Sequence, residues 1–398
     1  MLPHRPLVDL PPPPPEAVLQ SERLTDHIRQ AMAKQGGAIP FAHFMALALY
    51  APGLGYYSAG SRKFGAEGDF ITAPEISPLF ARCLARNCAV VLKELPGADL
   101  LEVGAGSGVM AADLLRTLAD RATLPEHYYI LELSADLRLR QQTLLANTVP
   151  DFFARIVWLD ELPEQFRGVV VANELIDAMP VHRFCMAERG IFESFVVWQA
   201  DSGFELSDRL CDHQPLLERL HEMKTELGDG YLVPGYYSEI NLAADSWVRT
   251  LAERLTAGAI VLIDYGYPRA EYYHPERRRG TLMCHYRHYA HSDPLIFPGI
   301  QDITAHVDFT ALAEAGVAAG CELLGYTTQA HFLLSSGLEE EMARVDISTP
   351  QAHAQRAQQV QKLTMPGEMG ELFKVMALGK NIEAVLPGFT LRDQRGRL

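Results

Sequence analysis

The sequence predicts an α/β fold built on a mostly parallel sheet, and three observations lead to this prediction. Short apolar runs alternate with helical segments between residues 97 and 180, an order typical of right-handed crossovers and parallel strands. Runs such as "GVVVA" are apolar at every position, which favours strands buried on both faces. A glycine-rich turn, "GAGSG", joins the first apolar run to the helix that follows it.

The segment before this core is expected to be helical. Residues 1–20 read as a poorly ordered proline-rich leader, and residues 21–96 as an N-terminal helical or lid segment. Its helices are predicted at 22–35, 39–50 and 77–95, and the last has Ser77 as its N-cap and proline at its first position. A long glycine-rich loop separates the second helix from the third.

The core itself is predicted from residues 97–180 and 258–380. Helices are expected at 109–118 and 135–146, and the predicted strands lie within 99–103, 127–133, 155–162, 168–175, 258–266, 321–329 and 372–380. The last two are expected to pair antiparallel at the sheet edge. Residues 181–257 form a predicted insertion on the substrate side, with a hairpin turn at 188–190 and a closing helix at 243–255, and residues 381–398 form a C-terminal tail.

Composition excludes several classes of partner. The net charge of -15 and the pI of about 5.4 disfavour nucleic acid, whereas a basic protein or an arginine-bearing peptide would be attracted. The six cysteines contain no CxxC pair, so neither a disulfide framework nor a zinc site is predicted. No run of 18 apolar residues suggests membrane insertion, and no apolar or Arg/Ser-rich leader is visible. We therefore expect a cytoplasmic protein.

The glycine turn indicates the kind of cofactor. "EVGAGSG" places glycines at strict two-residue spacing, whereas a dinucleotide loop needs a glycine at the position of Val109, and no Gly-Lys-Ser/Thr of a phosphate loop follows. The loop therefore suits a ligand without a pyrophosphate, such as S-adenosylmethionine. The candidate ligands in this stretch are Glu102, Gly104, Ala105, Gly106 and Gly108.

Polar residues follow the next three predicted strands, at the edge where open α/β sheets bind ligands. Glu132 can accept hydrogen bonds from both ribose hydroxyls, and Asp160 from the adenine amine. Asn173 can hold the amino acid end of the cofactor. Leu133 and Glu161, the neighbours of Glu132 and Asp160, complete the predicted set of cofactor contacts.

These motifs resemble the class I S-adenosylmethionine-dependent methyltransferases, and within them the MidA-type family that includes a mitochondrial complex I assembly factor. The resemblance covers about residues 24–380 and rests on "GLGYYS", "GDFITAPEIS", "LLEVGAGSGVMAADLL", "ANELIDAMPV", "IDYGYP", "GTLMCHYRH", "QDITAHVDF" and "EMGELFKVMALG". It implies a Rossmann-like, seven-stranded, mostly parallel sheet with an antiparallel edge strand. It also implies methyl transfer from S-adenosylmethionine with S-adenosylhomocysteine as product.

For the mitochondrial member of that family, the resemblance implies symmetric dimethylation of an arginine in a complex I subunit. A protein with a target arginine is thus the expected partner, with a homodimer left open. A guanidinium needs a carboxylate beside the nitrogens that are not methylated, and Glu174 and Asp177 follow the fourth strand. His306 is predicted in the wall of the acceptor pocket. His285, His288 and His291 have a spacing that lines up ligands, but we predict no metal site.

The stretch "GDFITAPEIS" is predicted to fold over the cofactor, with Asp69, Thr72 and Pro74 as contacts and Glu75 as an alternative to Asp69. Two other functions stay open. One is methylation of a small molecule beneath the insertion, and the other is a non-catalytic assembly factor.

Overall fold

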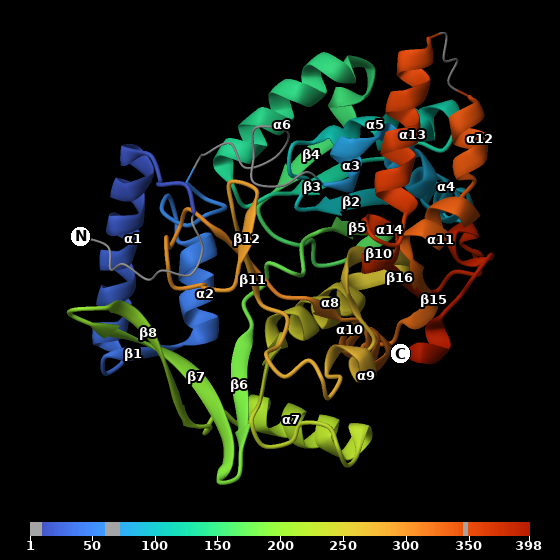
Figure 1. Cartoon of the computed structure of the whole chain (residues 1–398). Helices are drawn as coiled ribbons and strands as arrows, with labels where there is room; N and C mark the ends of the chain where they lie inside the picture. The colour runs from blue at the N-terminus through green and yellow to red at the C-terminus, as the bar shows by residue number, and fades with distance from the viewer. Residues whose placement is uncertain (1–9, 60–71, 345–348) are drawn as a thin grey trace.

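A mixed sheet of eight strands forms the centre of the molecule, for which a computed structural model describes residues 10–59, 72–344 and 349–398 (Figure 1). The strand order is β15-β16-β10-β5-β2-β3-β4, and β14 pairs with β10 beside this path. The strand bounds are β2 (Asp99–Val103), β3 (Tyr128–Leu131), β4 (Ile156–Leu159), β5 (Phe166–Asn173), β10 (Leu255–Tyr267), β14 (Val307–Asp308), β15 (Glu322–Thr328) and β16 (Phe373–Lys380).

Strands β4, β3, β2, β5 and β10 are parallel, so their carboxyl ends meet at one edge. The predicted antiparallel pair of β15 and β16 is present, and β16 also runs antiparallel to β10. The antiparallel strand is thus second from the edge, with β15 outside it. Seven of the eight residues of β16 are buried, which suits a strand covered on both faces and paired on both sides.

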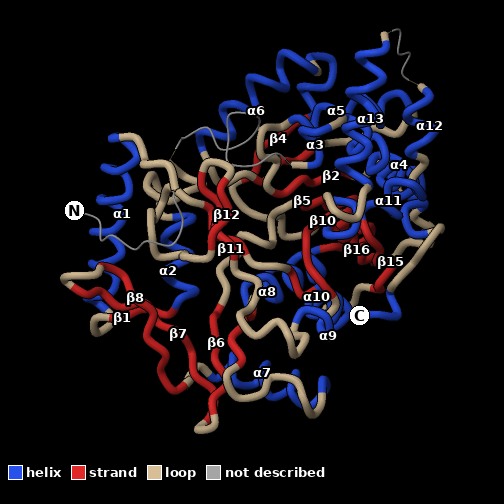
Figure 2. Tube along the Cα trace, viewed as in Figure 1, coloured by secondary structure: helices blue, strands red, loops and turns tan. Residues whose placement is uncertain are grey.

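Helices cover both faces of this sheet (Figures 1 and 2). Leu100 packs with α4 (Pro78–Glu94), α5 (Val109–Asp120) and α6 (Ala135–Thr148) on one face, whereas Leu101 packs with α8 (Leu242–Arg254) and α10 (Phe309–Ala318) on the other. Neighbouring strand residues point to opposite faces, so covering both faces requires the continuous apolar runs that predicted these strands.

The N-terminal segment joins the insertion in a second sheet. Strand β1 (Ala38–Pro40), between α1 (Pro15–Lys34) and α2 (Phe41–Tyr50), pairs antiparallel with β7 (Gly190–Gln199) of the insertion. The predicted hairpin is present, because β6 (His182–Ala187) turns into β7 through residues 188–189. The sheet is completed by β8 (Gly203–Leu210) and β9 (Tyr236–Ile240), with α7 (Gln214–Leu227) between them in the chain.

Helix α1 begins at Pro15, inside the stretch expected to be a disordered leader, so that expectation is corrected for residues 15–20. A proline at the first helical position lacks only an N–H that would have no partner there, and its fixed φ angle suits a helix start. Leu24 and Ile28 of α1 are fully buried against α2 and the second sheet. Burial of this apolar face keeps the segment helical.

The remaining elements connect these layers. A three-stranded sheet is formed by chain segments between β10 and α10, and further helices lie between β15 and β16 in the chain. Their bounds are α3 (Ala73–Ile76), η1 (Pro150–Arg155), α9 (Arg269–Tyr272), β11 (Met283–Tyr286), β12 (Tyr289–His291), β13 (Asp302–Thr304), α11 (Gln329–Ser335), α12 (Leu338–Ala343), α13 (Pro350–Thr364), α14 (Met369–Leu372), η2 (Pro387–Phe389) and η3 (Arg395–Arg397). Within the described ranges, no helix combines the length and the apolar character needed to cross a membrane.

Candidate active site

The glycine loop lies between β2 and α5. Gly104, Gly106 and Gly108 have φ angles of 72°, 54° and 85°, a left-handed region that side chains rarely adopt. A Cβ on Gly104 would also lie 2.9 Å from Leu175 Cδ1. Gly108 is the N-cap of α5, and Ala105 between the glycines is buried. The loop therefore presents backbone at the carboxyl end of β2, beside a helix N-terminus.

Glu102 lies within β2 and is 1% exposed. The Tyr128 hydroxyl of β3 donates to Glu102 Oε2 at 2.5 Å, whereas Oε1 has no hydrogen-bond partner among the described residues. Burial raises the pKa of Glu102 to about 7, an effect that the Tyr128 hydrogen bond opposes. This candidate is therefore anchored inside the sheet and keeps one acceptor oxygen open.

Glu132 follows β3, and its carboxylate is fixed by two hydrogen bonds. Ser134 N–H donates to Oε1 at 2.9 Å, and the Gln141 amide donates to Oε2 at 3.1 Å. Gln141, on α6, also donates to Gly106 O at 2.9 Å and accepts from Trp158 Nε1 at 3.0 Å. The fully buried Gln141 thus ties the glycine loop to Glu132, although no sequence motif marks it.

The other candidates at this end of the sheet are exposed. Leu133 is 80% exposed, and Asp160 and Glu161 lie at the surface after β4. Arg138 on α6 forms an ion pair with Asp160 at 2.9 Å and donates to Leu159 O at 2.8 Å. All three side chains are exposed where a ligand laid across the ends of β3 and β4 would reach them, and Arg138 holds the Asp160 carboxylate there.

Glu174 connects the sheet to the segment predicted to cover the cofactor. It follows β5 with a φ angle of 49°, and its N–H donates to Ile263 O at 2.9 Å. Its Oε1 accepts from Asn173 Nδ2 and from Ala73 N, both at 3.2 Å. Burial raises the pKa of Glu174 to about 8.

The Ala73 contact brings "TAPEI" to the carboxyl end of β5. Thr72 is the N-cap residue of α3 and Pro74 is buried within it, so this part of the stretch forms a helical turn. Asn173 Oδ1 has no hydrogen-bond partner within the described ranges. Asp69 lies outside the described residues.

Asp177 is held in a turn by a residue to which the sequence analysis gave no role. Asp264 Oδ2 accepts from Ile176 N at 2.9 Å and Asp177 N at 3.2 Å, and its Oδ1 accepts from Tyr265 N at 2.9 Å. Asp264 is fully buried, and this burial is the main reason that its pKa lies well above the usual range. Repulsion from the nearby Asp177 carboxylate raises the pKa further. Burial likewise raises the pKa of Asp177 to about 6, although the Tyr265 hydroxyl hydrogen-bonds its carboxylate.

We expect Asp264→Ala to lower the free energy of unfolding by about 3 kcal/mol, because it leaves the buried N–H groups of Ile176 and Asp177 and the part-buried N–H of Tyr265 without an acceptor. Asp264→Asn retains an acceptor oxygen and should lose less stability. Urea unfolding of both variants checks this prediction. Equal stability of the alanine variant and the wild type would contradict it.

Three further residues extend the site from distant parts of the chain. Tyr50, at the end of α2, donates to Ala178 O at 2.9 Å and stacks on Tyr57, with ring centroids 5.5 Å apart. The Tyr57 hydroxyl donates to Asp302, on β13, at 3.0 Å. Tyr57 and Asp302 lie in "GLGYYS" and "QDITAHVDF", but nothing in their local sequence predicts that they meet.

His306 packs between two tyrosine rings of β10, edge to face with Tyr265 at 5.0 Å and stacked on Tyr267 at 5.3 Å. Burial lowers its pKa to about 4, so it is neutral at physiological pH. Tyr265 connects His306 to Asp177, because its ring packs against His306 and its hydroxyl hydrogen-bonds the Asp177 carboxylate. The candidates His285, His288 and His291 are not part of a possible metal-ligand group among the described residues.

A mostly parallel sheet whose glycine loop and carboxylates gather at one edge is typical of ligand-binding α/β proteins, and comparison with known proteins identifies the class. The model of the family described as "Putative S-adenosyl-L-methionine-dependent methyltransferase" matches residues 83–327, more than half of the chain. The chain belongs to this family. It is therefore an S-adenosylmethionine-dependent methyltransferase, as the resemblance implied.

Solved and curated relatives agree. A Burkholderia thailandensis protein whose crystal structure is bound to S-adenosyl-homocysteine is 46% identical and covers 98% of this chain and 100% of its own, with a TM-score of 0.92. The "Protein arginine methyltransferase NDUFAF7, mitochondrial" of Danio rerio is 29% identical, over 86% of this chain and 83% of its own. The human protein of that name is 28% identical, over 87% and 81%. The fold class and the cofactor predicted from the sequence are confirmed.

The expected cytoplasmic location is wrong by the same comparison, because these curated relatives are named as mitochondrial. That expectation rested on the lack of a recognisable leader, and such a lack gives no positive evidence for a compartment.

Proposed function

We propose that the chain transfers methyl groups from S-adenosylmethionine to the guanidinium of an arginine in a protein substrate. The observation that carries this proposal is the pair of carboxyl groups after β5, those of the half-buried Glu174 and the buried Asp177. The names of the curated relatives support the same acceptor.

The electrostatics of this pair suit a cationic guest. Burial raises both pKa values, and among the described residues no cationic side chain offsets it for either group. A guanidinium would supply the missing positive charge and favour the ionised carboxylates. Its planar fork can then place one nitrogen toward the methyl group while the carboxylates hold the others.

The cofactor supplies an electrophilic methyl group on a sulfonium, and the chain's task is to orient donor and acceptor. In our proposal the backbone of residues 104–108, with Glu102, Asn173, Thr72 and Pro74, holds the amino acid end. Glu132 and Leu133 bind the ribose, and Asp160 and Glu161 face the adenine. Asp69, beyond the described ranges, stays a candidate for the same pocket.

The acceptor pocket would be completed by the tyrosine wall. Tyr50 and Tyr57 stack near the Asp177 turn, and Asp302 fixes the Tyr57 hydroxyl. Aromatic faces stabilise a guanidinium in the desolvated state. His306 would be a neutral wall residue, since its pKa of about 4 makes it a poor base for the acceptor.

The partner we propose is a basic segment of a respiratory complex I subunit, in accord with the net charge of -15. To test this, methylarginine-containing peptides are quantified by mass spectrometry in cells with and without the protein, and after complementation with Glu174→Gln. We expect one site to lose methylation without the protein and to stay unmethylated with the variant. Unchanged arginines together with a lost metabolite methyl group would favour a small-molecule acceptor, and rescue of complex I by the variant would favour a non-catalytic role.

A further inference from the structure

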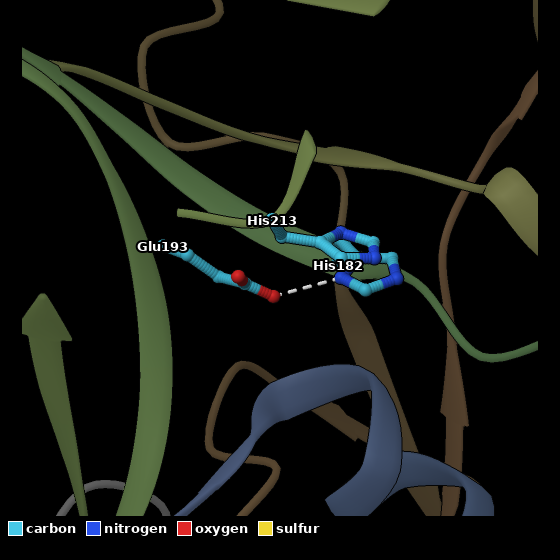
Figure 3. Close-up of side chains that lie close together, drawn as sticks. All are labelled: His182, Glu193 and His213. Atoms are coloured by element: carbon cyan, nitrogen blue, oxygen red, sulfur yellow. Dashed lines mark hydrogen bonds and ion pairs between the residues drawn. The ribbon is translucent and has the colours of Figure 1, made fainter. Parts of the chain in front are cut away.

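A second polar cluster lies in the insertion and shares no residue with the proposed methyl-transfer site. It consists of His182 at the start of β6, Glu193 on β7 and His213 just before α7 (Figure 3). One possible ligand atom from each of the three residues lies within 4.8 Å of the other two. The three positions are separated by a hairpin and by β8, so the fold brings them together.

Glu193 is the first unusual member of this cluster. Its side chain is 2% exposed, and its carboxylate has one hydrogen-bond partner among the described residues, His182 Nδ1 at 2.8 Å. A buried carboxylate is costly unless it is paired or coordinates a metal ion. No arginine or lysine forms an ion pair with it in the described ranges, and its polar neighbours include the two imidazole rings and the Cys211 thiol.

His213 is the second unusual member. Its ring stacks on that of His182 with centroids 4.7 Å apart, and its Nδ1 is buried without a hydrogen-bond partner among the described residues. A buried polar atom of this kind usually has a protein, water or ion partner. The close-up shows both rings on the same side of the Glu193 carboxylate (Figure 3).

We propose that His182, Glu193 and His213 bind one divalent metal ion of borderline softness, with zinc as the best fit. Two imidazoles and one carboxylate are a donor set that suits zinc, and a water molecule can fill the fourth position. Ligand atoms around a tetrahedral zinc are about 3.4 Å apart, given bonds of about 2.1 Å. Binding therefore opens the contact between His182 and Glu193 slightly and draws His213 inward by side-chain rotation.

The bound ion would act on the architecture of the insertion. It would join β6, β7 and the start of α7, and β6 is the strand that follows the Asp177 turn. The ion would therefore brace the sheet on the substrate side without taking part in methyl transfer. This inference does not depend on the identity of the methyl acceptor.

The test uses the full chain without an affinity tag, stripped with EDTA and then equilibrated with zinc chloride. We expect one zinc per chain after dialysis and a melting temperature that rises with zinc concentration. His213→Gln and Glu193→Gln should weaken zinc binding at least about 100-fold, the upper end of the loss seen for outer-shell partners. His127→Ala, which removes a histidine paired with Asp99 at 3.1 Å elsewhere, is the matched control and should bind zinc normally.

Two measurements keep the test decisive. Binding of S-adenosylhomocysteine reports whether each variant is folded, and Cys211→Ser separates this site from binding by a nearby thiol. Cobalt bound at the proposed site should show nitrogen and oxygen ligation without a thiolate band. Wild-type protein that retains no zinc, a folded His213→Gln variant with unchanged zinc affinity, or loss of zinc in Cys211→Ser alone would each overturn the proposal.

Discussion

Glu174→Gln should lower kcat/KM for the methyl acceptor about 1000-fold, the size expected when a preorganised group facing the reacting charge is removed. The amide keeps an oxygen that can accept from Ala73 N and Asn173 Nδ2, so the local backbone should stay in place. The substitution removes the negative charge of the carboxylate that we propose pairs with the acceptor guanidinium. Steady-state kinetics with an arginine-containing acceptor and calorimetric binding of S-adenosylhomocysteine measure the two effects separately.

S-adenosylhomocysteine should bind the variant with nearly wild-type affinity. A parallel loss of cofactor binding would make Glu174 a cofactor ligand and contradict the role assigned to it. The pH profile gives a second readout. Ionisation of Asp177 and Glu174, with pKa values of about 6 and about 8, should make wild-type kcat/KM rise between pH 6 and pH 8.

The same substitution should have the opposite effect on stability. The pKa of Glu174 rises from 4.5 to about 8 on folding, so the folded state holds this proton over a range where the unfolded state has lost it. This contribution to stability is therefore lost as the pH rises from 4.5 through 8. Glu174→Gln should melt above the wild type at pH 8.5, whereas Glu164→Gln, an exposed neighbour in the sequence, should not.

Glu132→Ala should weaken the binding of S-adenosylhomocysteine about 100-fold. In our assignment the carboxylate accepts both ribose hydroxyls, and two hydrogen bonds to a charged group are together worth about 3 kcal/mol. The truncation also removes the acceptor for Ser134 N–H and the Gln141 amide, which orders the glycine loop. Isothermal titration calorimetry measures the loss.

Two companion variants show where that loss arises. Glu126→Ala alters an exposed glutamate before the amino end of β3, the opposite end of the same strand, and should bind normally. Glu132→Gln restores an acceptor for Ser134 and should lose less affinity than the alanine variant. Normal binding in Glu132→Ala would remove Glu132 from the proposed ribose site.

Features of the fold with a local signal were predicted from the sequence. Ser77 accepts from Leu79 N at the start of α4, as its position before Pro78 indicates, and β6 and β7 meet at the expected turn. The pairing of β1 with β7 was not predictable, because three residues give no period and their partner lies more than 150 positions away. The place of β16 inside the sheet is likewise decided by pairing between distant segments.

The residues of the candidate site likewise include some with a local sequence signal and others that only the folded chain brings together. Glu132, Asp160 and Glu174 follow parallel strands, so alternation of strands and helices was enough to predict that they share an edge. Asp264 was overlooked because a carboxyl group inside a strand looks like part of the sheet until its three N–H donors are seen. Tyr57 and Asp302 come from a loop after α2 and from a strand of a small added sheet, and only the folded chain brings them together.

The hydrogen bond from Ala73 N to Glu174 Oε1 joins the proposed donor and acceptor sites directly. One end of it belongs to the turn beside the proposed donor pocket, and the other to the carboxyl proposed to receive the acceptor. A shift of that turn when the methyl donor enters would change the proton affinity of Glu174, and occupation of Glu174 by a cation would act back on the turn by the same free energy. The affinities for donor and acceptor would then be coupled, so that each substrate changes the binding of the other.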